Sequence, residues 1–371
     1  MKHRPESIKE LHLINPYIPG KPIEEVKRLL KIDKVYKLAS NENPFPPPLS
    51  VRKEIINSIN CLNRYPDASS FYLKRELSKR FKVSKSKIFL GNGSDEIITL
   101  VLKAFINKGD EVIISFPTFL IYKIQSILFR AKVVEVPINK DYRYDLWGMF
   151  NKITKRTKII FIANPDNPTG TYINERELFS FIRKIRRNII IYLDEAYFEY
   201  ALKERDYPRS LKLLDRYENI IISRTFSKAR GLAGLRIGYA FSSPFIVSCL
   251  EKVREPFNVN SVAQRAALQS LKDEKYLKKV VDFTLQQKEY IYSQLSKMKV
   301  KFIPTATNFV PVYVGENVDK VCSFLLKEGI IVRNLNSWGL KGFIRVTVGK
   351  ISENKAFIKA FRKMMQRGGI V

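Results

Sequence analysis

The sequence is poor in the residues from which disulfide frameworks and metal centres are built. Its 371 residues include three cysteines and two histidines. Cys61, Cys249 and Cys322 are odd in number and widely spaced, and His3 and His12 both lie close to the first residue. No two of these side chains have the short spacing of a zinc site, and distant unpaired thiols do not indicate a disulfide framework. We therefore expect neither a metal nor structural disulfides.

Long apolar runs are also missing. No stretch reaches the length of about 18 apolar residues that a membrane-spanning helix needs. The first residues, Met1-Lys-His-Arg-Pro-Glu6, are charged, and no apolar stretch of the kind found in a secretory signal follows them. The sequence predicts a soluble cytoplasmic protein that does not associate with membranes.

Acidic residues are scarce relative to basic ones. The chain has 36 Asp and Glu against 66 Lys and Arg, which gives a formal charge of +30. Such an excess raises the possibility of nucleic-acid binding, because phosphate contacts dominate that affinity. The basic residues are spread evenly along the chain, which favours non-specific adhesion to polyanions over specific nucleic-acid recognition. A non-enzymatic polyanion-binding protein nevertheless remains an alternative.

Apolar runs of strand length recur along the chain, and each of them ends in a polar loop. With 45% hydrophobic residues the chain can bury a large core in two or three packed units. Helical segments alternate with the apolar runs, which predicts a doubly wound α/β sheet with its ligand at the carboxyl ends of the strands. The expected strands occupy residues 88–91, 111–116, 132–137, 158–163, 188–194 and 220–222.

A break in the strand pattern at Glu255-Pro256 predicts a change of domain. A long helical stretch follows it, and the remainder alternates helices with expected strands at residues 308–314 and 342–349. We expect a large α/β domain over residues 31–255. Residues 1–30, a proline-rich arm and one amphipathic helix, and residues 256–371 are expected to form the arm and a smaller α+β domain.

Lys228 lies just beyond the apolar run Ile220-Ile-Ile222. Burial and a neighbouring cation such as Arg236 would lower the pKa of its ammonium group, as a lysine that bonds covalently to a carbonyl requires. Taken alone, Lys228 could equally be one of the many surface lysines of this basic chain.

Two further strand ends carry polar groups that could bind a ligand. The turn Gly91-Asn-Gly93 leads into a helix with Ser94 as its expected N-cap, so the amides of Ser94 and Asp95 can bind a phosphate or simply cap the helix. Asp194 ends another strand and is costly to bury without a cationic partner, although it too could be a helix cap.

The segment around Lys228 resembles a known family. Residues 224–239, Arg-Thr-Phe-Ser-Lys-Ala-Arg-Gly-Leu-Ala-Gly-Leu-Arg-Ile-Gly-Tyr, are similar to the cofactor lysine segment of fold type I pyridoxal-phosphate (PLP) aminotransferases, and within them to the histidinol-phosphate aminotransferases. Asn41-Glu-Asn-Pro44 and Asn164-Pro-Asp-Asn-Pro-Thr-Gly170 resemble two other loops of that family. The resemblance extends from Tyr17 to Gly349 and implies a mostly parallel doubly wound sheet with a second, smaller α+β domain.

The resemblance also implies a set of site residues. Lys228 would hold PLP and act as the catalytic base. Further cofactor contacts are expected from Ser94, Asp95, Phe119, Asn167, Asp194, Tyr197, Thr225, Ser227 and Arg236, and from Tyr65 of the second subunit of a homodimer with shared active sites. The acidic group of the substrate is expected at Arg345 and Arg333, with Tyr17 and Asn43 also contacting substrate.

Three positions depart from the family pattern. Phe119 stands where the family usually has a tyrosine, and keeps the ring face without the hydroxyl. Arg230 replaces an aromatic residue beside the lysine, which alters the expected packing there. Asp166 replaces an asparagine, which is expected to alter turn hydrogen bonding more than chemistry, although an added carboxylate near the site could disfavour an anionic substrate.

The implied reaction is amino transfer between L-histidinol phosphate and 2-oxoglutarate, giving imidazole acetol phosphate and L-glutamate, in histidine biosynthesis. An aromatic amino acid aminotransferase could share every cofactor residue. A phosphothreonine decarboxylase would also use Lys228, but the arm Tyr17-Ile-Pro-Gly-Lys-Pro-Ile-Glu-Glu25 argues against it. The residues of the side-chain pocket are too generic to choose among these substrates.

Overall fold

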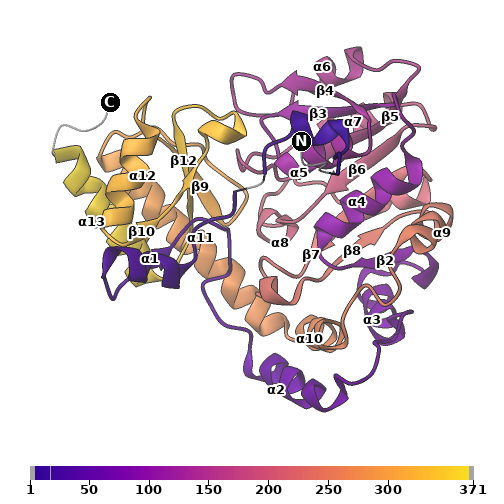
Figure 1. Cartoon of the computed structure of the whole chain (residues 1–371), viewed down its shortest axis with the longest axis horizontal. Helices are drawn as coiled ribbons and strands as arrows, with labels where there is room; N and C mark the ends of the chain where they lie inside the picture. Colours follow the sequence, from indigo (N-terminus) through magenta and orange to yellow (C-terminus); the bar gives the residue numbers. More distant parts are fainter. Residues whose placement is uncertain (1–4, 17, 367–371) are drawn as a thin grey trace.

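A seven-stranded sheet forms the centre of the larger part of the molecule in the computed structural model, which describes residues 5–16 and 18–366 (Figure 1). The strand order is β2-β8-β7-β6-β5-β3-β4. Neighbouring strands are parallel except where β8 pairs with β2 and β7. The mostly parallel sheet predicted from the sequence is therefore confirmed. The strands are β2 (Ile88–Gly91), β3 (Glu111–Phe116), β4 (Lys132–Pro137), β5 (Thr157–Ala163), β6 (Ile190–Asp194), β7 (Ile220–Thr225) and β8 (Gly238–Phe241).

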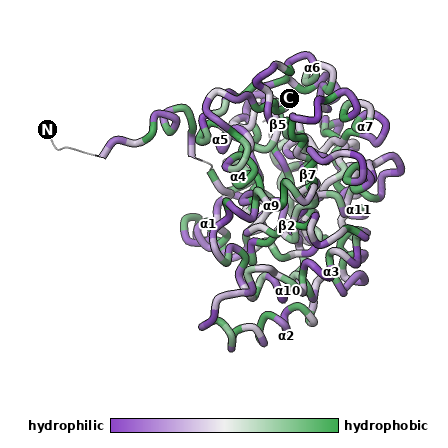
Figure 2. Tube along the Cα trace, turned by 90° about the vertical axis from the view of Figure 1, so that its right-hand side faces the viewer, coloured by the Kyte–Doolittle hydropathy of each residue, from purple (hydrophilic) through white to green (hydrophobic). Residues whose placement is uncertain are grey.

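The central strands are apolar throughout because both faces of the sheet are covered. In β5, Ile160 and Ile162 belong to the hydrophobic core on one face, whereas Ile159 and Phe161 belong to the core on the other. This alternation follows from the two-residue period of a strand, and a strand covered on both sides needs apolar residues in both registers. Figure 2 shows these apolar segments gathered inside the molecule.

Helices cover the two faces as separate layers. The first core includes side chains from α3 (Phe71–Phe81), α6 (Leu146–Asn151), α7 (Glu175–Lys184) and α10 (Ser261–Lys272). The second includes side chains from α4 (Ser94–Phe105), α5 (Leu120–Leu128) and α9 (Pro244–Val253). The sheet is thus doubly wound as expected, and the carboxyl ends of its parallel strands share one edge.

The smaller part of the molecule is built on an antiparallel sheet of order β11-β12-β9 (Figure 1). These strands are β9 (Phe309–Tyr313), β11 (Arg333–Asn334) and β12 (Phe343–Thr347). A short parallel pair joins β1 (Tyr36–Lys37) to β10 (Ile330–Ile331). The helices of this part are α1 (Ile23–Leu30), α11 (Glu274–Lys297), α12 (Val318–Lys327) and α13 (Ile351–Gln366).

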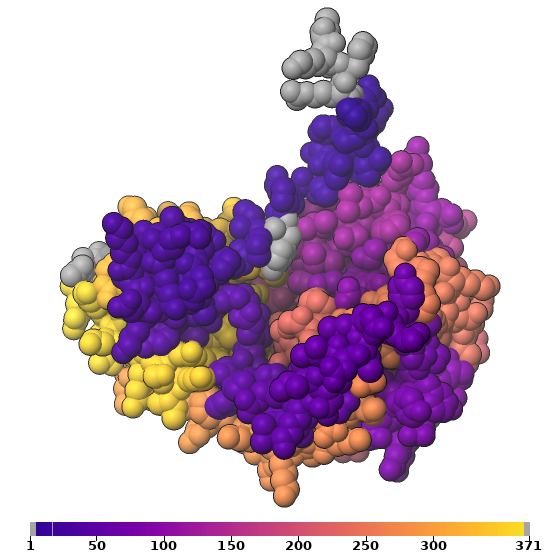
Figure 3. Space-filling model, turned by 60° about the horizontal axis from the view of Figure 1, so that its bottom comes forward, coloured from indigo at the N-terminus to yellow at the C-terminus, as the bar shows by residue number. Residues whose placement is uncertain are grey.

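The segment after residue 255 does not pack entirely with the smaller sheet. Val259 and the α10 residues Ala263 and Ala267 belong to a core of the seven-stranded sheet. Figure 3 shows α2 (Leu49–Ser58) on the outer surface beside α10. We therefore propose that the large unit extends through α10 and that the two units meet within α11, rather than at the predicted residue 255.

Within the described ranges, no helix has both the length and the apolar character that a bilayer crossing requires. In the same ranges, no group of three or more His, Cys, Asp or Glu side chains is arranged to hold a metal ion.

Candidate active site

A pocket of about 190 Å³ lies at the carboxyl ends of the parallel strands. It collects residues from strand ends, from the helix start at α4 and from the smaller sheet. Eleven residues predicted from the sequence line it: Ser94, Asp95, Phe119, Asn167, Asp194, Tyr197, Thr225, Ser227, Lys228, Arg236 and Arg345. The remaining lining residues are Ser40, Asn41, Tyr122, Ala163, Pro165, Ala196 and Trp338.

Lys228 follows β7, and its amine reaches the centre of the pocket. Nζ lies 3.4 Å from the carbonyl oxygen of Ser40 and 5.7 Å from the ring centroid of Tyr197. Burial, with a further contribution from the positive charge of Arg345, lowers the pKa of Lys228 to about 8. The neutral fraction of the amine near neutral pH is therefore well above that of an ordinary lysine, as a nucleophile or a base requires.

Asp194 is the last residue of β6 and lies at the buried end of the pocket. Its Oδ2 accepts a hydrogen bond of 2.8 Å from the Tyr122 hydroxyl, and its Oδ1 accepts one of 3.1 Å from the backbone N–H of Ala196. No ion pair among the described residues includes Asp194. Burial, with a contribution from the charge of Asp95, raises its pKa to about 6. The site thus fits a ligand that brings a cationic N–H to this carboxylate.

The start of α4 and Arg236 together form a cup suited to an anion. Arg236 has a left-handed backbone, with φ of 52°, and its Nη2 lies 3.4 Å from Asp95 Oδ2. A Cβ atom on Gly93 would lie 2.6 Å from that same Nη2, so only glycine leaves room for the guanidinium there. The N-cap is Gly93, with φ of 84°, and not Ser94 as the capping pattern predicted. The first amides of α4 and the guanidinium of Arg236 therefore lie at the same end of the pocket, where both can bind one anion.

Arg345 is fixed in the opposite wall by hydrogen bonds from its guanidinium. Nη1 donates to Oδ1 of Asn167, and Nη2 donates to the carbonyl oxygen of Ala39 at 2.9 Å. Its Cζ also lies 5.2 Å from the ring centroid of Trp338. A buried arginine held in this way presents a permanent positive charge to the pocket.

Four lining residues that the sequence analysis did not select complete the walls: Ser40, Asn41, Tyr122 and Trp338. Asn41 donates a 2.8 Å hydrogen bond to the Tyr197 hydroxyl, and its backbone N–H donates to Thr347 Oγ1. Asn41 is the first residue of the Asn-Glu-Asn-Pro loop. The resemblance of this loop to the family therefore indicated a contact with the site, but the prediction placed that contact at Asn43. Tyr122 is the third residue of α5, whose N-cap is Phe119, and the two rings meet edge-on with their centroids 5.6 Å apart.

Three predicted residues do not line this pocket, and Tyr17 lies outside the described residues. Asn43 donates to the carbonyl oxygen of Ala229 at 2.9 Å, behind Lys228. Arg333 Nη1 donates to the carbonyl oxygen of Ile18 at 2.7 Å. Tyr65 is 82% exposed, and its ring stacks on that of Phe257 with the two ring centroids 4.6 Å apart.

The carboxylate of Asp166 is engaged in its own loop and does not line the pocket. Its Oδ1 accepts hydrogen bonds from the hydroxyls of Thr118 and Tyr144 at 2.8 and 2.9 Å, and its Oδ2 accepts from the backbone and hydroxyl of Thr169. Burial raises the pKa of Asp166 above its ordinary value, and the hydrogen bonds from Thr118, Thr169 and Tyr144 oppose that rise. Asp166 thus pins the turn that carries Asn167, and the expected repulsion of an anionic substrate has little basis.

Arg230, the other departure from the family pattern, turns away from the pocket. It is 4% exposed, and its Nη2 forms an ion pair of 3.1 Å with Glu274. Its Nη1 donates to the carbonyl oxygen of Ser270. The side chain therefore joins the segment after Lys228 to the junction between α10 and α11.

These groups together match the chemistry of PLP. A buried amine suits its aldehyde, a buried carboxylate suits its ring nitrogen, and the cup of Gly93, Arg236 and the α4 amides suits its phosphate. The class of protein that this fold and site define is the fold type I PLP-dependent transferases.

Comparison with known proteins narrows that class. Residues 33–361 match the model of the family "Aminotransferase class I and II". The histidinol-phosphate aminotransferase of Moorella thermoacetica is 40% identical over 95% of this chain and 91% of its own. That of Caldicellulosiruptor saccharolyticus is 42% identical over 96% of this chain and 99% of its own. The chain therefore belongs to the class I and II aminotransferases, and within them to the histidinol-phosphate aminotransferase family.

Solved structures agree with this placement. The crystal structure of histidinol-phosphate aminotransferase from Sinorhizobium meliloti, in complex with pyridoxal-5'-phosphate, superposes with a TM-score of 0.89 at 25% identity and covers 99% of both chains. The enzyme of the same name from Clostridium acetobutylicum superposes with a TM-score of 0.83 at 25% identity, over 90% of this chain and all of that one.

Proposed function

We propose that this protein uses PLP to transfer the amino group of L-histidinol phosphate to 2-oxoglutarate, a step of histidine biosynthesis that gives imidazole acetol phosphate and L-glutamate. The observation that carries this proposal is the convergence of Lys228, Asp194 and Arg345 on one pocket. Membership of the histidinol-phosphate aminotransferase family supports the choice of substrate.

Different residues of the pocket would bind different parts of the cofactor. When bound, PLP supplies an aldehyde that exchanges with amino groups and a ring that takes up an electron pair. Asp194 holds the ring nitrogen protonated, and its hydrogen bond from Tyr122 fixes the carboxylate in place. Arg236 and the first amides of α4 would bind the phosphate, and Phe119 would offer its ring to the flat face of the cofactor.

Lys228 is the residue that moves the proton. Its Nζ would carry a proton from the substrate carbon that bears the amino group to the carbon of the cofactor's aldehyde group. The lowered pKa of about 8 leaves a larger neutral fraction of the amine near neutral pH than an ordinary lysine has, and that fraction can accept the proton. Arg345, which contributes to this lowering, also faces the acidic end of the substrate.

We propose that Arg345, with Arg333 beside it, binds that acidic end. They are directly paired in register on β12 and β11, so their side chains leave the same face of the small sheet. The indole of Trp338 lies 5.2 Å from Arg345 Cζ and 6.0 Å from Arg333 Cζ. Two guanidinium groups beside one aromatic wall suit a phosphate or a carboxylate attached to a ring or short chain.

We further propose a homodimer in which Tyr65 completes the site of the partner subunit. Tyr65 does not line the pocket of its own chain and is 82% exposed. Leu49, Ile56 and Leu62, near it in sequence, are each more than half exposed, and a second copy would bury them. The cytoplasm is the proposed location, because the relatives are named for a biosynthetic step.

Mixing two inactive variants tests the shared site. Lys228→Ala and Tyr65→Ala homodimers should each be impaired, because every site of each lacks one residue. After random exchange of subunits, half of the dimers are mixed and each contains one intact site, so activity should recover to about a quarter of the wild-type value. A site built within one chain predicts no recovery, and a monomeric sedimentation coefficient would also contradict the proposal.

The substrate is tested by titrating PLP-loaded protein and following the loss of the absorbance band of the lysine-bound cofactor. L-histidinol phosphate should convert the cofactor to its amino form at lower concentration than phenylalanine, tyrosine or phosphothreonine, and 2-oxoglutarate should reverse the change. Conversion only by the aromatic amino acids would reassign the protein to aromatic amino acid transfer. A protein that gives no band with PLP would be a binding protein rather than an aminotransferase.

A further inference from the structure

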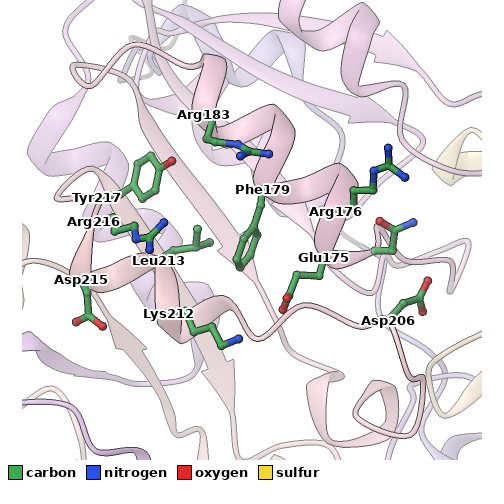
Figure 4. Close-up of a pocket in the computed structure, with 11 residues that line it drawn as sticks. Glu175, Arg176, Phe179, Arg183, Asp206, Lys212, Leu213, Asp215, Arg216 and Tyr217 are labelled. Carbon is green, nitrogen blue, oxygen red and sulfur yellow. The ribbon is translucent and has the colours of Figure 1, made fainter.

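A second and larger hollow lies on the surface of the large unit, away from the active site. This groove, of about 1030 Å³, runs between α7 and the 3-10 helix η4 (Ser210–Asp215) with the residues after it. Figure 4 shows Phe179 pointing into the groove from α7, toward the side from which Lys212 and Leu213 come. Its lining shares no residue with the active-site pocket.

Four basic side chains line the two walls of the groove, and they have no acidic partners. Arg176 and Arg183 come from α7, whereas Lys212 and Arg216 come from the opposite wall (Figure 4). No ion pair within the described part of the chain includes any of the four. Basic side chains on two facing walls raise the local potential near them and favour an anion between them.

The acidic side chains of the groove are, by contrast, already engaged. Glu175 accepts a hydrogen bond of 2.8 Å from the backbone N–H of Arg209, and Asp206 accepts one of 2.6 Å from the Tyr172 hydroxyl. Asp215 lies 3.8 Å from the amine of Lys87. These contacts fix the carboxylates in place while leaving their charge, so the four basic side chains exceed the three acidic ones of the lining by one positive charge.

The floor of the groove is apolar and offers one open aromatic face. Leu213 and Tyr217 are buried in the core of the sheet, and Phe179 packs against that core while still lining the groove. Arg187 already covers the ring of Tyr217, with Cζ 3.9 Å from its centroid. Among the described residues, no ring or cation stacks on Phe179, so its exposed face can receive a flat ring.

We propose that this groove binds a nucleotide with several phosphates. The polyphosphate lies between Arg183, Lys212 and Arg216, and the base stacks on Phe179. The groove is large enough for such a ligand, since small-molecule sites commonly measure about 300–1,000 Å³. This site is separate from the proposed aminotransferase chemistry and does not depend on it.

The proposal is tested by calorimetric titration of the PLP-loaded protein with ATP, tripolyphosphate and adenosine. Salt near 0.15 M keeps the general attraction of a +30 chain for anions weak. ATP should bind, tripolyphosphate should bind at least tenfold more weakly, and adenosine should not bind detectably. The double variant Arg183→Gln, Arg216→Gln should lower the affinity for ATP at least tenfold. Phe179→Leu should make the affinities for ATP and tripolyphosphate equal.

A matched control separates this groove from the overall charge. The double variant Lys108→Gln, Lys278→Gln also removes two positive charges, but from exposed positions outside the groove. It should leave the affinity for ATP unchanged. An equal loss of ATP affinity in the control double variant would show that the attraction is non-specific and would contradict the proposed site. Equal binding of ATP and tripolyphosphate by the wild type would overturn the stacking of a base on Phe179. The fold of each variant is checked by its thermal midpoint and its PLP band.

Discussion

Replacing Lys228 by alanine is expected to lower amino transfer by roughly a thousandfold or more, because the substitution removes both the covalent anchor and the base. The visible band of the lysine-bound cofactor should disappear as well, which gives a readout independent of turnover. Lys288→Met is the matched control. Lys288 is also buried and its pKa is also lowered to about 8, but it donates to the carbonyl oxygen of Thr305 and does not line the pocket.

The pH dependence of cofactor capture sharpens this test. Only the neutral amine of Lys228 can attack the aldehyde, so the rate at which the apoprotein captures PLP should rise with pH and level off above about 8. A lysine with an unshifted pKa would show a rate still rising well above that pH. Retention of the band by Lys228→Ala, or its loss in Lys288→Met, would place the attachment elsewhere.

Replacing Asp194 by asparagine should have the second largest effect. The substitution keeps the shape of the side chain but removes the charge that pairs with the ring nitrogen, and breaking such a buried pair costs about 3 kcal/mol or more, or roughly a hundredfold. Both the affinity for PLP and the rate of transfer should fall. Equilibrium binding of PLP, measured by absorbance, and single-turnover rates check the two effects separately.

The same carboxylate gives a second pH signature. Because burial raises the pKa of Asp194 to about 6, affinity for PLP should fall as the pH falls through 6 and the carboxylate takes up a proton. This dependence should vanish in Asp194→Asn. Asp166→Asn is the control, since Asp166 is equally buried but is held by hydroxyls of its own loop. Equal losses in the two variants would mean that any buried carboxylate near the site matters only for stability.

The sheet and most of the pocket could be predicted because they depend on local patterns. A strand covered on both faces is apolar throughout, and the carboxyl ends of parallel strands share an edge, so the polar residues after each strand must gather there. Asp194, Asn167 and Lys228 all follow such strands, and all three line the pocket. The family resemblance then supplied roles that the pattern alone left open.

The residues that were missed lie in the pocket through tertiary packing. Tyr122 lies on α5, which packs over β3 and β4, and its side chain crosses β5, where it stacks on Phe161, to reach Asp194 at the end of β6. Trp338 joins the wall because the smaller sheet meets the larger one. Strand β8 went unrecognised because Gly238–Phe241 is short. The packing of α10 on the large core was missed for a related reason. Its apolar face is built mainly from alanines, which give a weak hydrophobic signal.

The placement of the two tryptophans gives the protein a built-in optical probe. Trp147 is 63% exposed on α6, whereas Trp338 is 2% exposed in the wall of the active-site pocket. Light absorbed by the buried indole can pass to a chromophore a few ångströms away, while the exposed indole emits into water. In a Trp147→Phe background the remaining fluorescence therefore reports on occupancy of the pocket alone, and binding can be followed in real time without any added label.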